Sequence, residues 1–149
     1  NLKKNTTNLI LELATEKENN GYLFNYNGLI LLQSYTSRDK ELVMGKAVSI
    51  VVQKSTISSI LPSVEEQDTT KGFFKWFGLR DVITKKPRVV LLNNLMFLDL
   101  VNKGVEFVEK ISLITAKTLA ELEKLKTIEE LEHFNYEVYF SIFLKEQGV

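Results

Sequence analysis

The stretch from Lys71 to Asn94 constrains the fold more than any other part of the chain. It holds six basic residues and a single acidic one, Asp81, although the formal net charge of the whole protein is zero. Thr84 to Pro87 is a predicted turn, because proline fixes φ and forces the residue before it into extended geometry. A predicted strand from Arg88 to Leu92 follows. This stretch therefore indicates paired antiparallel strands with a basic, aromatic-rich surface.

Other apolar runs separated by turn residues predict further strands. Tyr22 to Phe24 and Leu29 to Leu32 flank an Asn-Gly pair, which is the strongest short-range signal for a β-hairpin. Alternation of apolar and polar residues, or density in aromatic and β-branched residues, predicts strands in four more segments. These are Ala47 to Lys54, Leu95 to Val101, Val105 to Ile114 and Phe134 to Leu144. Asn102-Lys103-Gly104 is the predicted turn between the second and the third.

Two segments have helical patterns. Leucine and isoleucine positions predict one helix from Thr7 to Lys17, capped by Thr6 or Thr7, and another from Thr115 to Leu131. The second is expected to break near Thr127, where the following glutamates favour a new helical turn. Strands with few helices predict an α+β fold rather than a helical bundle.

Length and composition fit one globular domain. A chain of 149 residues can bury an adequate core, and the absence of cysteine excludes disulfides, thiolate metal sites and a cysteine nucleophile. The longest apolar runs have about four residues, far fewer than the roughly 20 that span a bilayer. Because the chain opens on Asn1 rather than methionine, we expect it to be a fragment of a longer protein.

The sequence lacks the motifs of common enzyme classes. It contains no phosphate-binding glycine loop, no nucleophile elbow and no zinc-binding helix motif. His133 is the only histidine, which rules out a multi-histidine metal site within the chain, and we interpret it as an ordinary surface residue. The pairs Glu65-Glu66 and Glu129-Glu130 are interpreted as solvated carboxylates. We therefore expect no catalytic residues, no metal and no cofactor.

The basic, aromatic stretch has three interpretations. It is a solvated strand face, an anionic lipid site or a nucleic-acid surface. The excess of glutamate between Glu121 and Glu146 argues against a polyanion, so we expect no nucleic acid. The lipid interpretation uses the cations Lys71, Lys75, Arg80, Lys85, Lys86 and Arg88, with Phe73, Phe74, Trp76 and Phe77 at the membrane or a partner.

The same stretch resembles the pleckstrin homology domain of phosphoinositide-dependent protein kinases, including fungal homologues. The resemblance rests on Lys71-Gly72-Phe73-Phe74, on Val82 to Val89 with its Thr-Lys-Lys-Pro-Arg core, and on Asn94. An upstream Asn27 to Leu31 resembles the first strand of that family. The chain departs from the family pattern where Lys75-Trp76-Phe77-Gly78 replaces expected cations. The closing helix of the family is not evident after Leu144.

The resemblance implies a pleckstrin-homology-like, strongly bent antiparallel sheet or barrel of about seven strands with one or two helices. It would occupy residues 1–149 as one domain, with a long insertion at about 35–70. The implied function is that of a non-catalytic regulatory module of a signalling protein, such as a serine/threonine kinase, that binds phosphoinositide at the cytoplasmic face of the plasma membrane. The alternative is a module with a degenerate lipid pocket that mediates protein interaction or homodimerisation.

Overall fold

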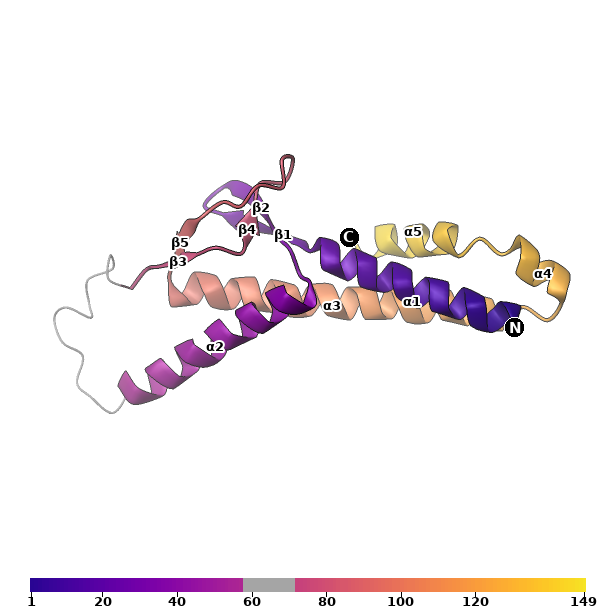
Figure 1. Cartoon of the computed structure of the whole chain (residues 1–149), viewed down its shortest axis with the longest axis horizontal. Helices are drawn as coiled ribbons and strands as arrows, with labels where there is room; N and C mark the ends of the chain where they lie inside the picture. Colours follow the sequence, from indigo (N-terminus) through magenta and orange to yellow (C-terminus); the bar gives the residue numbers. More distant parts are fainter. Residues whose placement is uncertain (58–71) are drawn as a thin grey trace. The chain divides into compact units, whose positions relative to one another are not determined.

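The computed structural model describes residues 1–57 and 72–149, with no side chains described for residues 53–57. This part of the chain is α+β and contains five helices and five short strands (Figure 1). In order they are α1 (Leu2–Asn20), β1 (Tyr22–Tyr26), β2 (Leu29–Gln33), α2 (Ser37–Ile57), β3 (Phe74–Trp76), β4 (Leu79–Arg80), β5 (Val90–Leu92), α3 (Asn94–Glu123), α4 (Ile128–His133) and α5 (Tyr136–Glu146).

The chain forms two compact units. Unit 1 consists of Asn1–Asn19 and Glu106–Val149, and unit 2 consists of Asn20–Val105. Helix α3 contributes its first part to unit 2 and the rest to unit 1. Each unit has its own buried side chains.

Unit 2 contains two small antiparallel sheets. One has the strand order β1-β2-β4, and the other pairs β3 with β5. The β1-β2 connection turns at Asn27 and Gly28, which both have positive φ (48° and 93°), as a tight hairpin turn requires. The Asn25 Oδ1 atom accepts a hydrogen bond of 2.7 Å from the Gly28 N–H and braces this turn.

Aromatic side chains form part of the core of unit 2. Trp76 packs edge-on against Phe97 with ring centroids 4.9 Å apart, and Phe74 contacts the same ring. Tyr22 lies edge-on to Tyr35, and its hydroxyl donates a hydrogen bond of 2.7 Å to the Leu100 carbonyl of α3. The sheets and the start of α3 are thus joined by aromatic packing and by a buried hydrogen bond.

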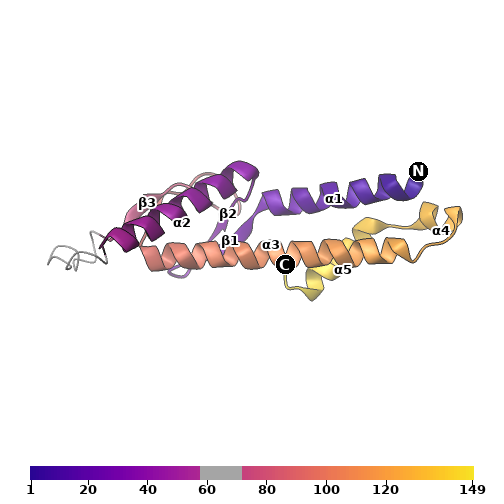
Figure 2. The same cartoon turned by 90° about the horizontal axis from the view of Figure 1, so that it is seen from below.

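Unit 1 consists of helices joined by short non-helical connections. Helix α1 and the later part of α3 run alongside each other in opposite directions (Figure 2), with an ion pair of 3.6 Å between Lys3 and Glu123. Lys117 of α3 contacts α5 through an ion pair with Glu146 and through its position over the Phe143 ring. The buried positions of α3 in this unit recur every three or four residues and face one side: Phe107, Ile111, Ile114, Thr118 and Leu122.

The expected pleckstrin-homology-like barrel is wrong. The structure has short strands in two small open sheets instead of about seven strands in one bent sheet, and helix predominates. The α+β class is the part of the expectation that agrees with the structure.

Strands predicted at Leu95 to Val101 and Val105 to Ile114 are wrong, because both segments belong to the continuous helix α3. Asn102-Lys103-Gly104 was interpreted as a turn between them. Gly104 is instead a buried helical residue, where a side chain would lie 2.9 Å from the Tyr22 hydroxyl. The glycine therefore allows close packing in place of a chain reversal.

The strands predicted at Ala47 to Lys54 and Phe134 to Leu144 are also wrong, because the first lies in α2 and most of the second lies in α5, which begins at Tyr136. In α2, Val43 and Ile50 are seven residues apart, so they lie on one buried face while Val48 is exposed. In α5 only Phe140 is fully buried among the aromatic and β-branched residues that suggested a strand. Packing of one helical face outweighed the weak strand preference of these residue types.

Several local predictions are confirmed. The hairpin between residues 22 and 33 and a helix over Thr7 to Lys17 are present. The turn predicted at Thr84 to Pro87 lies slightly earlier, at residues 82–84. Thr127 caps α4, and its hydroxyl accepts a hydrogen bond of 3.1 Å from the Glu130 N–H. Thr6 and Thr7 are not caps, because α1 begins at Leu2 and their hydroxyls donate to carbonyls four residues earlier.

Candidate functional site

Residues 81–88, which lie between β4 and β5, form an ordered loop that we call the basic loop. Its ends are joined by a hydrogen bond of 2.9 Å from the Asp81 N–H to the Lys86 carbonyl, and the Lys85 N–H donates back to the Asp81 carbonyl. The Asp81 carboxylate accepts hydrogen bonds of 2.9 Å from the Ile83 and Thr84 N–H groups. These bonds to Thr84 and Ile83 hold the pKa of the carboxyl below its usual value. The only acidic side chain of the loop is thus engaged in hydrogen bonds to the loop's own backbone.

The basic loop presents an apolar tip beside cations. Ile83 is 89% exposed, the largest exposure among the large apolar side chains described. Lys85, Lys86 and Arg88 are all exposed, and neither lysine makes an ion pair within the described residues. A protruding isoleucine next to three cations is an arrangement that suits an anionic, partly apolar surface.

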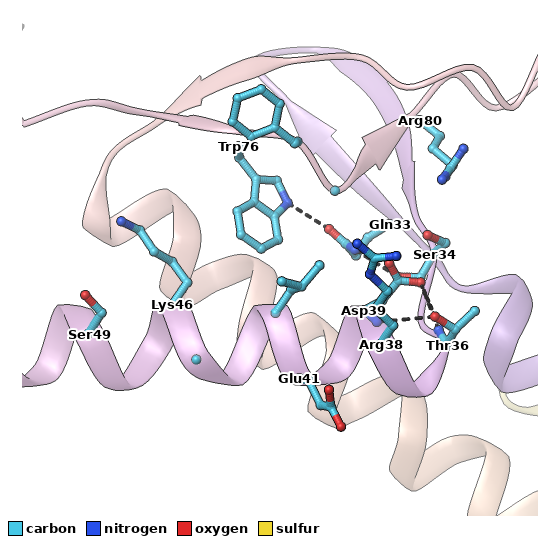
Figure 3. A pocket seen from close by; sticks show the side chains of 14 residues that line it. Gln33, Ser34, Thr36, Arg38, Asp39, Glu41, Lys46, Ser49, Trp76 and Arg80 are labelled. Carbon is cyan, nitrogen blue, oxygen red and sulfur yellow. Dashed lines mark hydrogen bonds between the residues drawn. The ribbon is translucent and has the colours of Figure 1, made fainter.

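A second feature is a pocket of about 1000 Å³ in unit 2. It lies between one face of α2, the end of β2 and the segment from Trp76 to Arg80 (Figure 3). The α2 residues that line it include Arg38, Leu42, Gly45 and Ser49, whose spacing of three or four residues defines one helix face.

A buried polar pair fixes the wall of this pocket. The Trp76 Nε1–H donates a hydrogen bond of 2.9 Å to Gln33 Oε1, and Gln33 Nε2 donates to the Ser34 carbonyl. Gln33 is fully buried, so these two bonds orient its amide (Figure 3). Gly78 lies directly against the indole, since a Cβ at this position would be 2.8 Å from Trp76 Nε1. The indole is therefore held in one position at the edge of the pocket.

Three cationic and two acidic residues line the pocket. The Lys46 ammonium lies 4.1 Å from the centroid of the Phe74 ring, a cation–π contact. Arg80 donates a hydrogen bond of 3.0 Å from Nη1 to the Lys85 carbonyl and so connects the pocket with the basic loop. The Asp39 carboxylate accepts hydrogen bonds from both the N–H and the hydroxyl of Thr36, the residue that caps the start of α2.

The structure does not gather the cations predicted from the sequence into one site. Arg80 alone among them lines the pocket, while Lys85, Lys86 and Arg88 belong to the basic loop and Lys75 is exposed on β3. Lys71 lies outside the described residues.

The four predicted contact aromatics differ in exposure. Phe77 is 66% exposed and lines the pocket, and Phe73 is 37% exposed. Phe74 is half-buried under Lys46. Trp76 is only 8% exposed and hydrogen-bonded to Gln33, so insertion of its side chain into a membrane is incompatible with this fold.

Arg38, Lys46 and Ile83 were not singled out from the sequence. The first two share a pocket-facing side of α2, which becomes visible only if residues 37–57 are interpreted as a helix. Ile83 gave a weaker signal, since it and its neighbour Val82 are two apolar residues in an otherwise polar turn.

Other candidate residues form no site. His133 is exposed, with its Nδ1 atom 2.8 Å from the Glu129 carbonyl, and Glu130 participates in the α4 cap. Glu65-Glu66 lies outside the described residues. Across residues 1–57 and 72–149, no cluster of three acidic or histidine residues could hold a metal ion. In the same part of the chain, no helix has the length and apolar character needed to cross a membrane.

Comparisons with known proteins found no matching family model, no similar curated protein and no similar solved structure. The resemblance to pleckstrin homology domains therefore rests on the quoted sequence residues alone.

Proposed function

We propose that this chain is a binding module that docks reversibly on anionic phospholipid membranes through the basic loop. The observation that supports the proposal best is the 89% exposure of Ile83 on a loop that also presents three exposed cations. The internal hydrogen bonds of the loop hold this arrangement before binding, so little ordering cost remains.

The expected strength of docking follows from the groups involved. Each cation near an anionic leaflet contributes about 1 kcal/mol, and full burial of an isoleucine side chain contributes about 1.5–3 kcal/mol. Together they favour weak, reversible attachment. Because exposed charges are screened by salt, raising the ionic strength should weaken it.

Co-sedimentation with vesicles tests the proposal. We expect the chain to pellet with vesicles of phosphatidylcholine and phosphatidylserine, or with added phosphatidylinositol bisphosphate, and not with phosphatidylcholine alone. The variant Lys85→Glu with Lys86→Glu should lose binding to both anionic compositions, and Ile83→Ser should weaken it. Lys4→Glu with Lys126→Glu makes the same charge change at exposed positions in unit 1 and should have no effect.

Two results would refute lipid docking by this loop. One is equal pelleting of the wild type and the Lys85→Glu, Lys86→Glu variant. The other is no pelleting with any anionic vesicle, together with a dimer in size-exclusion chromatography that Phe77→Ser converts to a monomer. The second result would support self-association through the exposed Phe77 instead.

A further inference from the structure

We infer that the unit 2 pocket binds a small amphipathic anion, meaning a molecule that joins an aromatic or acyl body to one carboxylate or phosphate group. No residue of the basic loop lines this pocket, and Arg80 connects the two through its hydrogen bond to the Lys85 carbonyl. The inference does not depend on membrane docking.

The size of the pocket points to an organic ligand. Its volume of about 1000 Å³ is at the upper end of the range of about 300–1,000 Å³ typical of ligand sites. A bare inorganic anion would leave most of this space to water. The pocket therefore suits a molecule with a substantial body in addition to its charged group.

The apolar lining suits such a body. The fixed indole of Trp76, the largely exposed Phe77 ring and Leu42 all line the pocket. Gly45 of α2 leaves open space, because a Cβ built there has no neighbouring atom within 4 Å. An aromatic ring or acyl chain between α2 and Trp76 would cover apolar surface that is now accessible.

The charges near this lining favour an anion. Arg38 makes no ion pair in the described part of the chain, and Arg80 uses one of its five N–H donors on the Lys85 carbonyl. Arginine donors match carboxylate and phosphate oxygens in a bidentate geometry. Lys46 lines the pocket from α2, with its ammonium over the Phe74 ring, and adds a third positive charge (Figure 3).

The acidic residues of the lining offset this charge only in part. The Asp39 carboxylate is already engaged by Thr36. Glu41 projects from the side of α2 opposite to Lys46 in Figure 3. With three cationic and two acidic residues, the lining keeps an excess of positive charge.

Fluorescence of the single tryptophan provides a direct test. The probe is anilinonaphthalene sulfonate, an aromatic anion that accepts excitation energy from a nearby indole. Titration of the folded chain should give saturable probe emission on excitation of Trp76. Naphthoate and phenyl phosphate, one carboxylate and one phosphate, should each be tried as competitors, and at least one should displace the probe at lower concentration than neutral naphthalenemethanol.

Two variants and one control locate the site. Arg38→Gln with Arg80→Gln should weaken probe binding roughly tenfold or more, as expected when charge-assisted hydrogen bonds are lost. Gly45→Phe should abolish saturable binding by filling the pocket, while improving the helix propensity of α2. Lys4→Gln, in unit 1, should bind as the wild type does.

Circular dichroism of each variant shows whether it has folded, and Gly45→Phe remains informative if the double arginine variant does not fold. The inference is overturned if Gly45→Phe binds the probe as tightly as the wild type. It is also overturned if naphthalenemethanol competes as well as both anions, because the cations would then contribute nothing.

Discussion

At the scale of single residues, Trp76 shows why composition misleads about exposure. The sequence places it among cations and other aromatics, which suggests a membrane or partner contact. In the structure its indole N–H is bonded to the buried Gln33 amide, and its ring packs on Phe97. Both partners are distant in sequence, so no local pattern announces them. The exposed Phe77 next to it carries the accessible aromatic surface instead.

Two helical glycines provide a matched test of close packing. Gly104 lies where a Cβ would come 2.9 Å from the Tyr22 hydroxyl and 3.1 Å from that of Tyr35, whereas Gly45 has open space. We expect Gly45→Ala to stabilise unit 2 by about 0.5–1 kcal/mol through helix propensity. Gly104→Ala should destabilise it by about 1 kcal/mol or more, because the shift strains the bond from Tyr22 to Leu100.

Urea unfolding followed by Trp76 emission measures both changes in free energy of unfolding, since the tryptophan and both glycines belong to unit 2. If the two alanine variants stabilise the protein equally, Gly104 has no role in close packing against Tyr22 and Tyr35.

At the scale of elements, the sequence predicted those whose signals are local. The Asn-Gly hairpin depends on positive φ at two adjacent residues, and the Thr127 cap depends on a glutamate three residues later. The helix predicted from Thr115 matches the end of α3, but the part before Thr115 was missed. Its buried residues recur every three or four positions, the spacing of a single buried helix face: Phe97, Leu100, Gly104, Phe107, Ile111 and Ile114. Interpreting Gly104 as a turn divided that pattern into two apparent strands.

The candidate site was predictable only in part, for a related reason. The basic loop was recognised because its cations and turn residues are contiguous in sequence. The pocket was not recognised, because it exists only if α2 is a helix that lies beside Trp76. The sequence predicted a strand within that helix.

The basic loop gives an expectation about pH. Because the folded state lowers the pKa of Asp81, its carboxylate contributes stability to the loop above the ordinary value of 3.8. That contribution is lost as the pH falls through the lowered pKa. Carboxyl NMR titration should therefore give an Asp81 midpoint below 3.8, and the amide signals of Ile83 and Thr84 should move with it.

Asp81→Asn is the matched control, since it retains an acceptor oxygen and cannot titrate. In this variant the Thr84 amide signal should no longer follow the Asp81 transition. A midpoint at or above 3.8 in the wild type would mean that the hydrogen bonds from Ile83 and Thr84 are absent in solution.

At the scale of the whole molecule, the chain divides into two compact units that differ in how their parts are connected along the sequence. Unit 1 joins the two ends of the chain, so α1 packs with helices that lie more than a hundred residues later in sequence. Unit 2 is continuous, from Asn20 to Val105. Contacts within unit 2 are therefore closer in sequence, which favours its earlier formation during folding.

Because each unit has its own buried side chains, we expect the two units to unfold in separate steps. We expect Phe140→Ala to cost unit 1 about 3–5 kcal/mol, because Phe140 is only 1% exposed and truncation leaves a cavity. Helical circular dichroism should then show an early unfolding step in urea, while Trp76 emission, which reports on unit 2, keeps the wild-type midpoint. Phe97→Ala, which removes the ring beneath Trp76, should instead lower the midpoint of the emission. If circular dichroism and Trp76 emission give the same urea midpoint in both variants, α3 couples the two units and the protein unfolds in one cooperative step.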